Sequence, residues 1–117
     1  MAGLTTHILD LTHGAPADGV KIVLSVRNGG GAEKLKEAVT NADGRCDAPL
    51  IAANDMKKGG YLLEFHIGDY FRRKGIRLDD PAFLDIIPIA FAVSDIAAHY
   101  HVPLLVSPYG YSTYRGS

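Results

Sequence analysis

The sequence has one cysteine and almost no net charge, and both shortages narrow the class of protein. Cys46 has no partner for an intrachain disulfide, so a packed core has to stabilise the fold, and a lone thiol is compatible with a reducing compartment. The net charge is −1 with the histidines neutral. A chain without a charge excess has no general electrostatic attraction to nucleic acid or to an anionic membrane, and we expect neither partner.

Long apolar runs are also missing. The best one is interrupted by Pro88, Asp95 and His99, so nothing approaches the roughly 20 residues of a membrane helix. Residues 1–7 contain no basic region followed by an apolar core, and we expect no secretory signal. These patterns predict a soluble, cytoplasmic protein.

The residues that are present predict one β-rich domain spanning residues 1–117. At this length, with 47% hydrophobic residues, a single core can bury about two thirds of the chain's surface. Apolar residues alternate with polar ones in short runs that end at glycine, proline or asparagine, which is typical of strands. We expect an all-β sandwich of seven to eight strands with one short helix; the clearest expected strands are 5–11, 20–27, 34–40, 61–67, 85–93, 101–107 and 111–115.

Local signals add detail to this outline. The charged run 34–40 predicts an edge strand. Asn41, Asp43 and Gly44 predict a turn that delivers Arg45 to the start of another short strand. Residues 69–74 predict a helix that Asp69 caps and Gly75 closes.

Residues 85–93 are apolar at nearly every position. A strand without a polar face is usually covered on both sides, here by the core and by another element or subunit.

The last nineteen residues, 99–117, predict a tied-down hairpin rather than a loose tail. His101 alternates with Val102, Leu104 and Val106 and should lie on the opposite face. Pro103 lacks an amide donor and suggests either an edge position or the early part of a strand where the amide position points away from the neighbouring strand. The turn falls at 107–110, and the second arm, 111–115, carries Arg115 at its end.

Histidines on strand faces are the best candidates for chemistry, because imidazole titrates near neutral pH and can act as a base there. From the residues alone, His7 is either a semi-buried structural residue or a functional one. His99 and His101 share a face, and with His7 they form a possible zinc site with an open position, although no Cys, Asp or Glu adjoins them in sequence. Arg45 is either solvated or a planar donor for an anionic edge of a ligand.

Three segments carry a resemblance to a known family: residues 4–17, containing Leu-Thr-Thr-His-Ile-Leu-Asp; residues 40–45, Thr-Asn-Ala-Asp-Gly-Arg; and residues 99–117, ending in Tyr-Arg-Gly-Ser. In this order and spacing they resemble the signatures of the 5-hydroxyisourate hydrolase family of transthyretin-like proteins. Transthyretin itself shares Ser107-Pro108 and Tyr111-Ser112-Thr113 but not the final Tyr-Arg-Gly-Ser.

The resemblance implies a transthyretin-like sandwich that forms a homotetramer, a dimer of dimers, with sites between the dimers. It also implies hydrolysis of a urate-derived cyclic amide in purine catabolism, without metal or other cofactor. The residues it points to are His7 and His101 for catalysis, Arg45 for binding the ring, Tyr114 at the base of the pocket and Ser117 against ligand or water.

Two other functions stay open on sequence grounds. A carrier of transthyretin type would use the same groove without chemistry, and small apolar residues there would favour it. An immunoglobulin-like adhesion module would have polar loops in place of histidines on strands.

Overall fold

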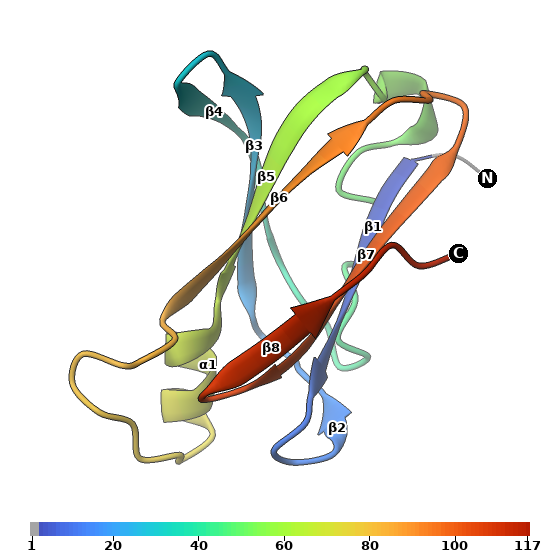
Figure 1. The fold of residues 1–117 in the computed structure, drawn as a ribbon. Coiled ribbons are helices and arrows are strands. Elements are labelled where there is room, and N and C mark those ends of the chain that lie inside the picture. The colour runs from blue at the N-terminus through green and yellow to red at the C-terminus, as the bar shows by residue number, and fades with distance from the viewer. Residues whose placement is uncertain (1–2) are drawn as a thin grey trace.

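The computed structural model describes residues 3–117, which form two four-stranded sheets packed face to face (Figure 1). The first sheet has the order β2-β1-β7-β8 and the second has the order β4-β3-β5-β6. The expected β-sandwich is therefore confirmed. The bounds of the elements are β1 Gly3–Asp10, β2 Ala15–Pro16, β3 Lys21–Asn28, β4 Gly31–Val39, β5 Gly59–His66, α1 Ile67–Arg73, β6 Ile86–Val93, β7 His99–Ser107 and β8 Gly110–Thr113, with a 3-10 turn at Ala53–Asp55.

One apolar core fills the space between the sheets, and the alternation of the strands supplies it. Ile22 and Leu24 of β3 are fully buried, as are Leu63 and Phe65 of β5. On β7, Val102, Leu104 and Val106 point inward, which leaves His101 on the outer face as expected. Burying each such aliphatic or aromatic side chain contributes about 1.5–3 kcal/mol.

The core face of β1 is the one opposite His7. Leu4 and Ile8 are fully buried, whereas His7 shares the half-buried outer face with Thr5 and Leu9. The alternation expected for this strand holds, but the apolar neighbours expected around His7 are limited to Leu9. Leu11 lies beyond the strand and is 56% exposed, so His7 lies on a half-buried outer face rather than in the core.

Two strands lie side by side in parallel although they stand at opposite ends of the sequence (Figure 1). β1 pairs with β7 over its whole length, with Thr5 opposite His101 and Gly3 opposite His99. Alternation then places Thr5 and His7 on the same outer face as the two β7 histidines.

Pro103 is not on an edge strand, which corrects the first of the two positions expected for it. It is buried in β7, between β1 and β8. Its carbonyl accepts a hydrogen bond from Thr113 Oγ1, so its amide position faces the β8 side. There β8 has ended at Thr113, and the chain returns to β7 only at the isolated Gly116–His101 bridge. A residue without an N–H fits this gap in the ladder.

Three further expectations are corrected in detail. Arg45 does not begin a strand, because residues 45–50 form a loop that runs alongside β1. Asp69 does not cap the helix: α1 begins at Ile67, its N-cap residue is His66, and Asp69 lies in the first turn. The second arm of the C-terminal hairpin ends at Thr113, before Arg115. The edge strand, the 41–44 turn and the helix end at Gly75 are confirmed.

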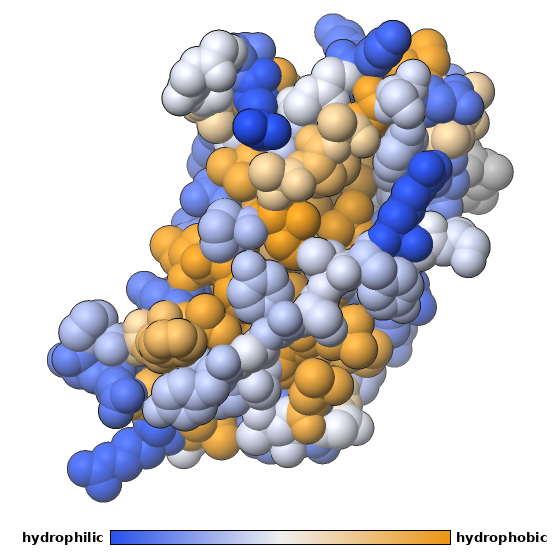
Figure 2. Space-filling view, viewed as in Figure 1, coloured by the Kyte–Doolittle hydropathy of each residue, from blue (hydrophilic) through white to orange (hydrophobic). Residues whose placement is uncertain are grey.

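β6 has one buried and one exposed face, and both are apolar. Ile87, Ile89 and Val93 point inward, while Pro88, Ala90 and Ala92 lie on the outer face, together with Ile86, which is 44% exposed. β6 ends one sheet and β8 ends the other. Figure 2 shows apolar side chains in the hollow between these two strands. Among residues 3–117, no helix is long and apolar enough to span a membrane.

Candidate functional site

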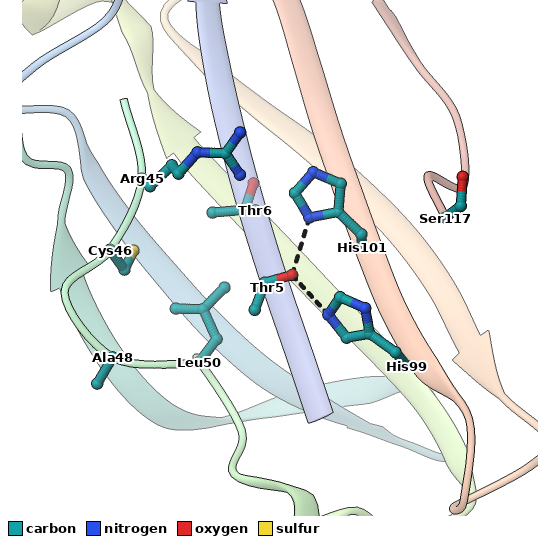
Figure 3. A pocket seen from close by; sticks show the side chains of 9 residues that line it. All are labelled: Thr5, Thr6, Arg45, Cys46, Ala48, Leu50, His99, His101 and Ser117. Carbon is teal, nitrogen blue, oxygen red and sulfur yellow. Dashed lines mark hydrogen bonds between the residues drawn. The ribbon is translucent and has the colours of Figure 1, made fainter. Parts of the chain in front are cut away.

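A pocket of about 390 Å³ opens on the outer face of β1 and β7 (Figure 3). Residues of β1 and β7 form one wall of the pocket, the 45–50 loop forms a second, and the end of the chain forms a third. Its lining residues are Thr5, Thr6, Arg45, Cys46, Ala48, Leu50, His99, His101 and Ser117. The volume lies within the range of small-ligand pockets, and apolar walls with a few polar groups are typical of such sites.

Arg45 reaches the pocket because a tight turn is fastened to β1. Asn41 Oδ1 accepts hydrogen bonds from the amides of Asp43 (2.9 Å) and Arg45 (3.2 Å), and the amide of Ile8 donates to the Gly44 carbonyl at 2.8 Å. Gly44 has φ +73°, and a β-carbon there would overlap the Ile8 carbonyl oxygen. Only glycine allows the turn to approach β1 so closely, and the next residue is Arg45.

The end of the chain is held against His101. The amide of Gly116 donates to the His101 carbonyl at 2.7 Å, and this bond brings Ser117 to the rim of the pocket. The guanidinium of Arg115 lies 4.1 Å from the centre of the Tyr100 ring and donates to the His99 carbonyl. The terminus is tied down as its composition predicted.

Four of the residues singled out in the sequence line the same pocket: Arg45, His99, His101 and Ser117. His7 lies beside it, on the same face of β1 as Thr5. Tyr114 does not lie in this pocket: it is 60% exposed and lines a separate groove between β6 and β8.

Both histidines are shifted toward the neutral form. Burial lowers the pKa of His7, and the positive charge of Arg45 lowers it further, although the Asp43 backbone and carboxylate oppose the shift. Burial likewise lowers the pKa of His101, followed by the charges of Arg45, His99 and His7. An imidazole that is neutral at physiological pH can accept a proton, as a general base must.

Thr5 was not singled out in the sequence, yet its hydroxyl lies between two imidazoles. Its Oγ1 is 2.9 Å from Nε2 of His99 and 2.8 Å from Nδ1 of His101. A threonine on a strand has high β propensity in any case, so its residue type carried no signal. Only the parallel register of β1 and β7 brings these three groups together.

Metal binding finds no support in the geometry. Within residues 3–117, no group of three or more His, Cys, Asp or Glu side chains is arranged to hold a metal ion, so His7, His99 and His101 do not form the zinc site considered from their spacing. Nor is Cys46 a strong nucleophile, because burial raises the pKa of its thiol.

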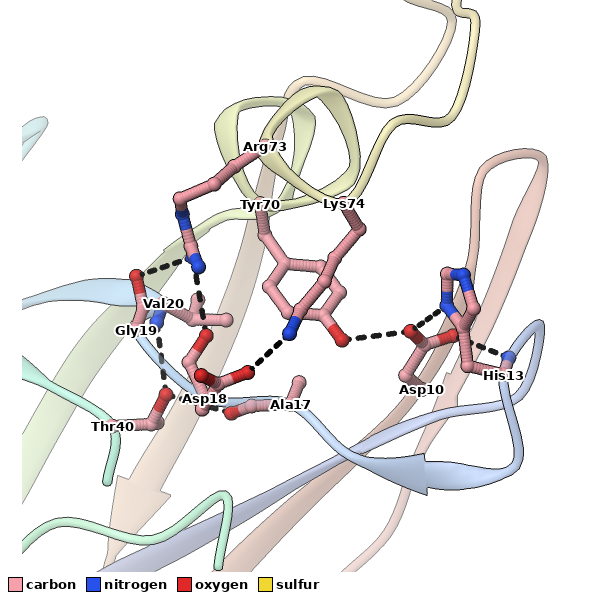
Figure 4. Close-up of polar contacts among 10 residues, drawn as sticks. All are labelled: Asp10, His13, Ala17, Asp18, Gly19, Val20, Thr40, Tyr70, Arg73 and Lys74. Carbon is pink, nitrogen blue, oxygen red and sulfur yellow. Dashed lines mark hydrogen bonds and ion pairs between the residues drawn. The ribbon is translucent and has the colours of Figure 1, made fainter. Parts of the chain in front are cut away.

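A second polar cluster lies away from the pocket and docks α1 onto the β1–β2 hairpin (Figure 4). The buried Asp10 carboxylate accepts hydrogen bonds from the Tyr70 hydroxyl at 2.7 Å and from the ring and amide of His13. Burial alone would raise the pKa of Asp10, but these donors outweigh it and hold the pKa below its usual value. The cluster is satisfied internally, which indicates a structural role.

Fold and site together define a transthyretin-like sandwich whose outer sheet face carries a histidine- and arginine-lined pocket. Comparison with known proteins gives the same class: the chain matches the HIUase/Transthyretin family over residues 4–116 and belongs to it.

The similar proteins include both 5-hydroxyisourate hydrolases and transthyretins. The chain is 57% identical to the 5-hydroxyisourate hydrolase of Caulobacter vibrioides, over the whole of both chains. Among solved structures it resembles Klebsiella pneumoniae 5-hydroxyisourate hydrolase, with 38% identity, a TM-score of 0.81 and full coverage of both chains. It also resembles transthyretin from Sparus aurata, with 28% identity and a TM-score of 0.86 over 99% of this chain and 97% of that one.

Proposed function

We propose that the pocket between β1, β7 and the 45–50 loop is the active site of an enzyme that hydrolyses 5-hydroxyisourate. The chain converts this cyclic amide to 2-oxo-4-hydroxy-4-carboxy-5-ureidoimidazoline, a step of urate breakdown. The observation that carries the proposal is the pair of neutral-shifted histidines, His7 and His101, beside a guanidinium on one sheet face. The full-length similarity to hydrolases of the family supports it.

The reaction needs a base, an anchor for the ring and a donor for the developing negative charge. His101, assisted by His7, removes a proton from a water molecule, and the resulting hydroxide attacks the carbonyl carbon of the cyclic amide. A C–O bond forms, the amide C–N bond breaks, and the protonated histidine returns its proton to the departing nitrogen. No other reactant is required.

Arg45 suits the anchoring role because its planar fork of donors matches an imide or carbonyl edge, and its positive charge stabilises the oxyanion. Ser117, at the opposite rim, holds the ring or the attacking water through its hydroxyl. Both residues restrict the orientation of the substrate, which lowers the entropic part of the barrier.

We further propose that the chain assembles as a homotetramer, a dimer of dimers. β6 and β8 are each an edge strand of one sheet and flank one groove, and the exposed face of β6 is apolar. Pairing these edges with a second copy would satisfy the free backbone groups and cover the apolar face. Tyr114 lies in this groove, and we propose that any contribution it makes to substrate binding depends on assembly. The free thiol of Cys46 supports a cytoplasmic location.

A carrier of transthyretin type is the alternative, and one experiment separates the two. Freshly generated 5-hydroxyisourate is followed by ultraviolet absorbance with and without the protein. An enzyme accelerates the decay at substoichiometric concentration, whereas a carrier binds the compound and leaves the decay unchanged or slower. The second result would overturn the proposal.

A further inference from the structure

We infer that Thr5 is a positioning residue: its hydroxyl accepts the Nδ1–H of His101 and donates its own proton to Nε2 of His99, which leaves Nε2 of His101 free as the base. This assignment rests on the proposed function for its catalytic consequence, but the hydrogen-bond pattern is argued from the geometry.

The hydroxyl of Thr5 has one proton and two neighbours. Both ring nitrogens lie within hydrogen-bond distance, at 2.9 Å for His99 and 2.8 Å for His101 (Figure 3). A hydroxyl can donate to only one of them and has to accept from the other. In the state in which both rings are neutral, their protons are therefore coupled: either both rings carry the proton on Nδ1, or both carry it on Nε2.

In a third arrangement the Thr5 hydroxyl accepts hydrogen bonds from both rings, and its own proton is then donated to neither of them. Within the described part of the chain the two imidazoles are the only hydrogen-bond partners found for Thr5 Oγ1. Leaving a half-buried donor unused costs free energy, since the hydrogen bond it makes in water is not replaced.

The surroundings of His101 decide between the two coupled forms. In Figure 3 the ring nitrogen of His101 that does not contact Thr5 points into the pocket, on the side where the Arg45 guanidinium lies. The charge of Arg45 acts on this imidazole, and a guanidinium offers only donors. A lone pair on Nε2 is attracted by that charge, whereas an N–H would oppose it. The Nδ1–H form of both rings is the favoured one.

Catalysis gains directly from this arrangement. Without a partner at Nδ1, a neutral imidazole exchanges between its two tautomers, and only the one with a bare Nε2 can take a proton from water in the pocket. Thr5 fixes that tautomer and the angle of the ring. His99 in turn orients the Thr5 hydroxyl. His99 therefore acts on His101 through Thr5 and needs no contact with the substrate.

The test measures tautomers and kinetics on the same variants. Protein labelled with ¹⁵N-histidine is examined by long-range ¹H–¹⁵N correlation spectra, which distinguish protonated from bare ring nitrogens, with His99 and His101 assigned from their Asn variants. Thr5→Val removes the hydroxyl but keeps a side chain of nearly the same size and shape, and Thr5→Ser retains the hydroxyl. Thermal unfolding of each variant establishes that it is folded.

We expect the proton on Nδ1 of both rings in the unaltered protein and in Thr5→Ser, and a mixture of tautomers at His101 in Thr5→Val. In the hydrolysis assay, kcat of Thr5→Val should fall roughly 10- to 100-fold, less than the loss of about 10²- to 10⁴-fold expected when a general base is removed. KM should change little, and kcat should recover in Thr5→Ser.

A proton on Nε2 of either ring in the unaltered protein would overturn the assignment, as would a Thr5→Val variant that keeps the Nδ1–H form or full kcat. The spectra are read without substrate. They therefore decide the hydrogen-bond pattern even if 5-hydroxyisourate proves not to be hydrolysed, which would count against the proposed function alone.

Discussion

A β-carbon on Gly116 would lie 2.6 Å from Cδ2 of His101. The backbone of the terminal segment is thus the surface on which the imidazole rests, and the Gly116 amide is bonded to the carbonyl of the same histidine. With Thr5 on its Nδ1 side and Gly116 against its carbon edge, the ring is held in one orientation.

Gly116→Ala should therefore lower activity without unfolding the protein. The methyl group displaces the His101 ring by a few tenths of an ångström or more, and a misplaced base loses much of its effect. We expect a reduction in kcat of about 10-fold or more, with little change in melting temperature. Gly30→Ala is the matched control, because nothing lies within 4 Å of a β-carbon at Gly30. Equal activity of the two variants would contradict the contact.

Replacing the proposed base should abolish most of the turnover. His101→Asn and His7→Asn are each expected to reduce kcat by about 10²- to 10⁴-fold. If the two histidines act as one unit, the double variant should be little slower than either single one. His66→Asn, at the last residue of β5, controls for the loss of a histidine elsewhere. If the effects of the two single substitutions on kcat simply add in the double variant, only one of the two histidines takes part in the chemical step.

The charge of Arg45 should be visible in the pH profile of kcat/KM. Burial and Arg45 lower the pKa of both His7 and His101, so the neutral, active form persists as pH falls past the ordinary value of about 6.5, and activity is lost only below it. Arg45→Gln removes the charge and should move this acid limb to higher pH. Arg45→Lys should leave the limb in place while weakening binding or turnover, because the planar fork is lost.

Arg27→Gln, an exposed arginine of β3, is the control for charge removal. An unmoved acid limb in Arg45→Gln would show that the guanidinium does not act on the titrating base.

Tyr70→Phe should destabilise the fold without affecting the pocket. The buried Asp10 carboxylate loses one of its donors, which costs about 1–3 kcal/mol. Because the pKa of Asp10 is depressed in the folded state, this contribution is present above the ordinary carboxyl value of about 3.9 and fades as pH falls below it. The difference in melting temperature from the unaltered protein should narrow in the same direction.

Tyr109→Phe, at a tyrosine that is 63% exposed, should shift stability by no more than about 0.5 kcal/mol. Unfolding is compared at one protein concentration, because the proposed assembly would add a concentration-dependent contribution to stability. Equal melting of the two variants at neutral pH would rule out a stabilising role for the Asp10–Tyr70 bond.

Assembly should depend on the outer face of β6. Ala90→Glu places a carboxylate on this apolar face, where a partner copy would have to desolvate it. Sedimentation is expected to show a tetramer for the unaltered protein and smaller species for the variant. Val39→Glu on β4, at another exposed position, should remain tetrameric. A monomeric unaltered protein at micromolar concentration would remove the proposal that the sites depend on assembly.

Much of the architecture follows from local patterns in the sequence. The alternation in 20–27 and 61–67 predicts which side chains fill the core, because a strand side chain has only two directions to take. The glycine and asparagine signals at 41–44 predict the turn beside Arg45, since few residues adopt its backbone angles. The motifs themselves pointed to His7, Arg45, His101 and Ser117 as site residues.

Other features were decided only by the tertiary structure. Residue types in 5–11 and 99–107 contain no signal that these distant segments pair in parallel, so neither the partnership of Thr5 with the two β7 histidines nor the interior place of Pro103 could be predicted. The sequence predicts that β6 is apolar on both faces, but only the fold shows that its outer face is exposed within one chain. Only the fold places Tyr114 in the β6–β8 groove. Side-chain direction is a local property of the backbone, whereas the pairing of strands depends on the packing of the whole domain, and the contacts of the pocket depend on that pairing.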